Sequence, residues 1–124
     1  MTGFVVFGHG SRVESANQAV RDVAAHLAAR GEFAVEPAFL ELGQPALCGA
    51  VDALVDRGAS RIVVIPYFLT LGTHLQRDLP KLIEESAAQH PSVSMKMTAP
   101  LDGHPALLEI LMDRAAKAAM EPAQ

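Results

Sequence analysis

Two short, strongly apolar runs restrict the fold of this chain more than any other feature of its sequence. The first is Phe4–Phe7, which ends at Gly8, and the second is Ile62–Ile65, which ends at Pro66. Both consist of β-branched or aromatic residues without polar alternation, which is typical of strands buried on both faces of a parallel sheet. A chain of 124 residues has room for one domain built around such a sheet.

Two further segments have the character of edge strands. The segment 33–40 contains Pro37, which cannot donate a ladder hydrogen bond, and the segment 93–98 alternates apolar and polar residues. Four amphipathic patterns predict helices after the four strands. Their apolar positions are Ala16, Val20, Val23 and Leu27; Leu47, Val51, Leu54 and Val55; Leu79, Leu82, Ile83 and Ala87; and Leu107, Leu108, Leu111, Met112 and Ala115.

Several single residues can be given structural roles within these predicted helices and strands. Pro80 is expected in the first turn of the third helix with Asp78 as its N-cap, and His104 is expected to cap the fourth. Cys48 is expected to be a small core residue. Of the remaining residues, His26 is expected in solvent, His90 as a charge partner at a helix end, and Met95 and Met97 in core packing.

The alternation of strands and helices predicts an α/β fold. We expect a single doubly wound domain over residues 1–120, with a disordered tail at 121–124. Its four-stranded parallel sheet should have the order 2-1-3-4, with helices on both faces. In open sheets of this kind, ligands bind outside the carboxyl ends of the strands where the chain reverses direction. The loops after the first and third strands are therefore the predicted site.

Those loops carry residues suited to metal chemistry. His9 lies between two glycines after the first strand, His74 follows the third strand, and Glu41 lies at the end of the second. Two imidazoles and a carboxylate suit a divalent transition metal, and a neutral imidazole can also accept a proton near pH 7. We therefore take His9, His74 and Glu41 as the candidate catalytic and metal-binding residues.

The segment 8–12, Gly-His-Gly-Ser-Arg, and the block from Pro66 to Pro80 resemble the sirohydrochlorin chelatase family of the CbiX and SirB type. The resemblance implies insertion of Co²⁺ or Fe²⁺, or of Ni²⁺ in some relatives, into sirohydrochlorin on the way to siroheme or cobalamin. It implies that His9 and His74 handle the metal and that Glu41 assists. The metal would be a substrate, and no organic cofactor is expected.

The expected tetrapyrrole carries many carboxylates, so an acidic protein must hold it with local positive charge and backbone N–H groups. The substrate-binding candidates come from the two loops: Gly10, Ser11, Arg12, Gly72, Thr73 and Arg77. Many class II chelatases resemble two such domains facing each other across a cleft. One domain covers only one side of a macrocycle, so a homodimer is expected.

Two other functions remain open from the residues alone. A metal or tetrapyrrole-binding protein without catalysis would need the same ligands. A histidine-phosphatase-like hydrolase is less favoured, because Gly8 stands where that class has an arginine. A net charge of −4 argues against nucleic-acid binding, and no apolar run approaches the roughly 20 residues that span a bilayer. With one cysteine and no signal-peptide pattern, a cytoplasmic location is expected.

Overall fold

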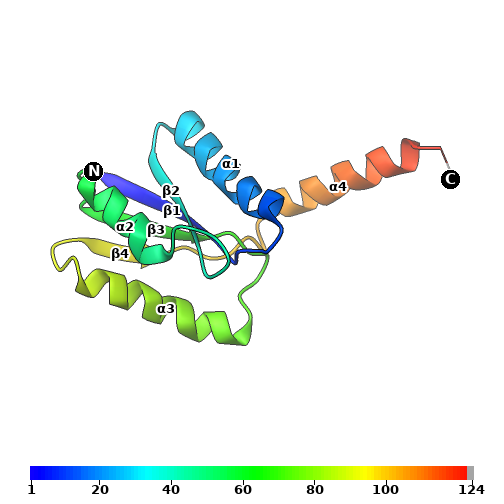
Figure 1. The fold of residues 1–124 in the computed structure, drawn as a ribbon. Helices are drawn as coiled ribbons and strands as arrows, with labels where there is room; N and C mark the ends of the chain where they lie inside the picture. The colour runs from blue at the N-terminus through cyan, green and yellow to red at the C-terminus, as the bar shows by residue number, and fades with distance from the viewer. Residues whose placement is uncertain (123–124) are drawn as a thin grey trace.

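In the computed structural model, which describes residues 1–122, four parallel strands are each followed by a helix (Figure 1). The order along the chain confirms the predicted alternation. The elements are β1 (Thr2–Gly8), α1 (Glu14–Gly31), β2 (Ala34–Phe39), α2 (Leu47–Asp56), β3 (Arg61–Pro66), α3 (Thr73–Ala88), β4 (Ser94–Met97) and α4 (Pro105–Met120). None of the helices in this part of the chain is long and apolar enough to cross a membrane.

The strands form one sheet in the order β2-β1-β3-β4, all parallel, as predicted. The two apolar runs are the central strands, where Val5 and Val64 are completely buried. Pro37 lies on the edge strand β2, opposite Val6 of β1, so its missing N–H interrupts no ladder on its outer side. This order places the reversal of chain direction between β1 and β3.

Helices cover both faces of the sheet (Figure 1). On one face α1 packs Val20 and Ala24 against Val6 of β1 and Phe39 of β2. On the other face α2 and α3 build the larger core cluster, whose buried members are Val5, Phe7, Ala38, Leu47, Ala50, Val51, Leu54, Ala59, Ile62, Val64, Leu79 and Ile83. Met95 and Met97 pack against this cluster, which confirms their expected role.

The fourth helix departs from the rest of the fold. Figure 1 shows α4 running away from the sheet and from the other helices, and α4 buries none of its residues. Leu108, Leu111 and Met112 of its predicted apolar stripe are all more than half exposed. His104 caps this helix as predicted, since the Ala106 N–H donates to His104 Nδ1 at 3.0 Å.

Two expectations about helices were wrong. The third helix begins at Thr73 with Gly72 as N-cap, so Asp78 and Pro80 lie in its interior. Half-buried Leu75 lies one turn before buried Leu79 and extends the apolar stripe upstream. Cys48 is exposed, because the buried stripe of α2 runs through its neighbours Leu47, Ala50, Val51 and Leu54.

The remaining expectations concern surface residues and the end of the chain. His26 is exposed, as expected. His90 follows α3, and its Nε2 lies 2.7 Å from Asp52 Oδ1 of α2, so it joins two helices as a charge partner. Of the tail predicted at 121–124, Glu121 and Pro122 follow α4, while residues 123 and 124 lie outside the described residues.

Candidate functional site

The loops after β1, β2 and β3 are joined by backbone hydrogen bonds at the carboxyl edge of the sheet. The N–H of Leu40 donates to Gly8 O at 3.0 Å, that of Glu41 to His9 O at 3.1 Å, and that of Tyr67 to Phe7 O at 2.8 Å. These bonds continue the pairing of the strands past their ends. The three loops at the carboxyl edge therefore form one connected surface. We call this surface, made by the loops after β1, β2 and β3, the platform.

His9 and Glu41 face each other on this platform. His9 Nδ1 lies 4.0 Å from Glu41 Oε1 and 3.2 Å from Gly10 O, and both side chains are a little over half exposed. The rings of His9 and of Phe68, from the loop after β3, are nearly perpendicular, with centroids 6.4 Å apart and an interplanar angle of 82°. All three loops therefore contribute to the position of this imidazole.

Gly10 allows the first and second loops to approach this closely. Its φ is +92°, a conformation that residues with a side chain rarely adopt. A Cβ at this position would lie 1.6 Å from Glu41 O. Only a glycine after His9 leaves room for the carbonyl of Glu41. Gly10 therefore allows the backbone beside His9 and the backbone of Glu41 to lie in contact.

A buried asparagine fixes the same two loops from α1. Asn17 Oδ1 accepts from the Ser11 N–H at 2.9 Å, and its Nδ2 donates to Ser11 O at 2.8 Å and to Leu42 O at 2.9 Å. The residue is only 2% exposed. Sequence reasoning missed Asn17, because buried positions of a helix are recognised by apolar residues and Asn17 is polar.

Replacement of Asn17 should therefore loosen the platform. We expect Asn17→Ala to lower the free energy of unfolding by about 1–3 kcal/mol, because it leaves partly buried backbone groups of the two loops without their side-chain partners. Urea denaturation measures this change. Gln18→Ala is the matched control: Gln18 is exposed on the same helix and bonds only to side chains, so its change should stay within about 0.5 kcal/mol. Equal losses in the two variants would contradict the role given to Asn17.

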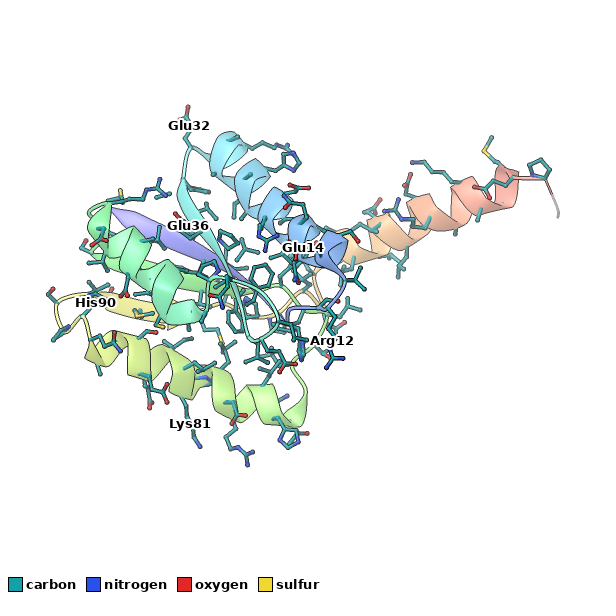
Figure 2. The ribbon with its side chains drawn as sticks, in the orientation of Figure 1. Arg12, Glu14, Glu32, Glu36, Lys81 and His90 are labelled. Atoms are coloured by element: carbon teal, nitrogen blue, oxygen red, sulfur yellow. The ribbon has the colours of Figure 1, made fainter. Side chains whose placement is uncertain are left out.

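Charged groups surround the start of α1. Arg12 lies on the loop after β1, and Figure 2 shows its side chain at the carboxyl-end side of the sheet, directed away from the body of the protein. Glu14 begins α1, and a hydrogen bond from Arg21, together with that residue's positive charge, holds the pKa of the Glu14 carboxyl below its usual value. Arg21 is thus occupied by Glu14, whereas Arg12 is exposed and available to an anionic ligand.

The structure places His74 in the first turn of α3, exposed, with its Nδ1 3.5 Å from Arg77 Nη2. Arg77 also lies 3.5 Å from Asp78 Oδ1. Gly72 and Thr73 form the N-cap and first residue of this helix, where backbone N–H groups are exposed. The second predicted loop therefore presents an imidazole and a guanidinium side by side.

The three predicted metal-binding residues do not form one cluster. Across residues 1–122, no group of three or more His, Cys, Asp or Glu side chains lies close enough together to hold a metal ion. The structure brings His9 and Glu41 together and leaves His74 outside that pair. A metal held here would have open positions for other ligands.

An apolar rim accompanies these polar groups. Val13, Leu42, Tyr67 and Leu69 come from the loops after β1, β2 and β3, and each is 38% to 63% exposed. Leu42 has a φ of +56°, a strained conformation for a leucine, which is typical of functional sites. Sequence reasoning missed this rim; the only signal was the presence of large apolar residues in loops at the carboxyl edge.

Comparison with known proteins gives a consistent result. The CbiX family profile matches residues 3–118. The chain is 35% identical over 113 residues to the chloroplastic sirohydrochlorin ferrochelatase of Arabidopsis thaliana, covering 90% of this chain and 50% of that protein. It is 30% identical over 118 residues to the sirohydrochlorin cobaltochelatase of Sulfolobus acidocaldarius, covering 95% and 93%.

Among solved structures, the sirohydrochlorin chelatase SirB from Bacillus subtilis subspecies spizizenii in complex with cobalt superposes with a TM-score of 0.87 and 27% identity. The match covers 94% of this chain and 50% of SirB. The chain thus spans about half the length of the Arabidopsis and Bacillus proteins and nearly all of the Sulfolobus protein.

Proposed function

The chain belongs to the CbiX family, and from that premise we propose that it inserts a divalent metal ion, Co²⁺ or Fe²⁺, into sirohydrochlorin. The observation that carries this proposal is the pairing of His9 with Glu41, 4.0 Å apart, on an exposed platform. Relatives named as cobaltochelatases and ferrochelatases support the reaction, and the SirB structure with cobalt supports the metal. The family match favours a chelatase over a phosphatase-like hydrolase.

Metal insertion requires a ligand that releases the metal and a base that takes the pyrrole protons. His9 Nδ1 lies near two acceptors, Gly10 O and Glu41 Oε1, so a hydrogen on Nδ1 leaves the lone pair of Nε2 for the metal. The partly exposed His9 can bind a hydrated cation through Nε2 and give it up to the ring nitrogens. Glu41, beside the imidazole, accepts one pyrrole proton in this proposal, and the second passes to solvent at the exposed site.

The surrounding residues suit a flat, polyanionic substrate. The apolar rim of Val13, Leu42, Tyr67 and Leu69 offers a surface for the macrocycle. Arg12 and Arg77 can pair with its peripheral carboxylates, assisted by backbone N–H groups around Gly10, Ser11, Gly72 and Thr73. His74, beside Arg77, is proposed as the second metal-handling imidazole, which reaches the metal only with the substrate in place.

The platform is open to solvent on the side away from the sheet. We therefore propose that a second copy of the chain covers the other side of the macrocycle in a two-fold homodimer. The single cysteine, Cys48, is exposed and free, which fits our proposed location in the cytoplasm.

The proposal is tested by anaerobic incubation of the chain with sirohydrochlorin and Co²⁺, Fe²⁺ or Ni²⁺ in turn, followed by absorbance spectroscopy. We expect many turnovers per chain with at least one of the three metals, at a rate well above that without protein. Stoichiometric binding without acceleration would show a binding protein instead, and absence of both would refute the assignment.

A further inference from the structure

Leu42 has a backbone conformation that no helix end explains. Its φ is +56°, in the left-handed region that residues with a side chain rarely adopt, because their Cβ then crowds the following carbonyl. Among residues 1–122, the only other residue with a side chain in this region is Glu32, at +54°. Glu32 is the C-cap of α1, where its N–H donates to Ala28 O and a left-handed residue is common. Leu42 lies in the loop between β2 and α2, so its conformation needs a different cause.

A buried side chain of α1 fixes this conformation. Asn17 Nδ2 donates to Leu42 O at 2.9 Å, and the same amide makes two bonds to the backbone of Ser11. Asn17 is 2% exposed, so rotation of the Leu42 carbonyl away from it would leave a buried N–H without a partner. The amide of Asn17 therefore opposes relaxation of Leu42 to an ordinary conformation.

The backbone on either side of Leu42 is also held. Before it, the Glu41 N–H donates to His9 O at 3.1 Å; beyond it, Pro45 O accepts from the Phe39 N–H at 2.9 Å. Its surroundings thus keep Leu42 in a conformation that the residue itself disfavours. A strained residue held in this way is typical of ligand-binding sites.

The strained backbone does not bury the leucine side chain. Leu42 is 51% exposed, whereas Leu40, two residues earlier, packs against the larger core cluster. Exposure of a large apolar side chain to water is unfavourable, so core packing does not account for the arrangement. The neighbouring side chain of Glu41, the proposed proton acceptor, is 57% exposed. An apolar ligand seated on Leu42 would therefore lie near Glu41.

We propose that Leu42 is the substrate-positioning residue of the rim: its side chain packs against one face of the macrocycle, and Asn17 acts through it by holding its carbonyl. The inference rests on the proposed metal insertion into sirohydrochlorin and names the residue that sets the affinity for the apolar face of this substrate. Arg12 and Arg77 pair with the peripheral carboxylates, whereas Leu42 contacts the ring. A contact made equally before and during metal insertion lowers KM without changing kcat.

The first experiment replaces the side chain of Leu42. The dissociation constant for metal-free sirohydrochlorin is measured by absorbance titration, and KM and kcat are then measured with Co²⁺. We expect Leu42→Ala and Leu42→Gly to bind about tenfold more weakly than the parent chain, because each loses the apolar surface that the ring would cover. KM should rise by a similar factor, with kcat within about twofold of the parent value. Leu42→Met keeps a long apolar side chain and should retain the parent affinity.

Stability measurements separate contact with the substrate from a structural role. Glycine is favoured over alanine at a left-handed position, so in urea denaturation Leu42→Gly should have a folded-to-unfolded ratio about fivefold above that of Leu42→Ala. Glu32→Gly and Glu32→Ala are the matched controls, because Figure 2 shows Glu32 at the end of α1 away from Arg12. They should differ in stability in the same direction, yet bind sirohydrochlorin like the parent. If Leu42→Gly kept the parent affinity and Leu42→Ala lost it, affinity would follow stability and the proposal would be wrong.

The link to Asn17 is tested by combining variants. Asn17→Ala should weaken the binding of sirohydrochlorin by a larger factor in the parent chain than in Leu42→Ala, because the second background has already lost the contact that Asn17 positions. Equal factors in the two backgrounds would contradict the action of Asn17 through Leu42.

The parent chain distinguishes failure of this inference from failure of the proposed function. A parent that neither binds nor metallates sirohydrochlorin would overturn both. A parent that does bind and metallate it, with an unchanged dissociation constant in Leu42→Ala, would overturn this inference alone.

Discussion

Replacement of His9 by alanine should lower kcat/KM for metal insertion into sirohydrochlorin by at least about 100-fold, because it removes the imidazole proposed to hold the metal in position for transfer. The expectation follows from its place: three loops converge on this imidazole, Glu41 lies 4.0 Å from its Nδ1, and Phe68 packs against its ring. Initial rates from anaerobic absorbance measurements, with Co²⁺ and with Fe²⁺, measure the change.

Two further histidine variants make this result specific. His26→Ala removes an exposed imidazole from α1 and should leave the rate unchanged. His74→Ala should also slow insertion, but less than His9→Ala, because His74 lies outside the His9–Glu41 pair. If His9→Ala retained the parent rate with either metal, the assignment of the platform as the catalytic site would be wrong.

The sheet could be predicted because its strands differ in composition for physical reasons. Only central strands tolerate apolar residues on both faces, and only an edge strand tolerates Pro37, so the order 2-1-3-4 followed from the residues alone. That order then placed Glu41 beside His9, which the structure confirms at 4.0 Å. The strand order thus predicts which residues distant in the sequence are neighbours in space.

The errors arose where a residue's role depends on tertiary packing. Asp78 and Pro80 are common at helix starts, yet burial of Leu75 and Leu79 on one side carries α3 a turn further upstream. Asn17 resembles a surface residue in the sequence, and only the folded loops supply the three partners that make its burial favourable. The apolar rim depends on which loops end up adjacent, as the left-handed Leu42 illustrates.

The fourth helix shows a different limit. Its amphipathic pattern correctly predicted a helix, but periodicity reports only that one side needs cover and not what covers it. Within the described chain nothing buries Leu111 or Met112. The pattern therefore predicts the local structure of α4 but not which surface would cover its apolar side.

Gly10→Ala should damage stability and catalysis together, and Gly58→Ala separates the two causes. Both glycines have positive φ, +92° and +102°, but only at Gly10 would a Cβ meet backbone, 1.6 Å from Glu41 O.

Gly58→Ala should destabilise the protein only through the strain of the left-handed conformation, by about 1–2 kcal/mol, without loss of activity. Gly10→Ala must also displace the loop at Glu41 and break the hydrogen bond that the Glu41 N–H donates to His9 O. We expect about 2 kcal/mol of additional destabilisation in urea and a fall in kcat/KM of roughly 100-fold, because His9 and Glu41 move apart. Equal stability and full activity in the two variants would show that the two loops need not be held together.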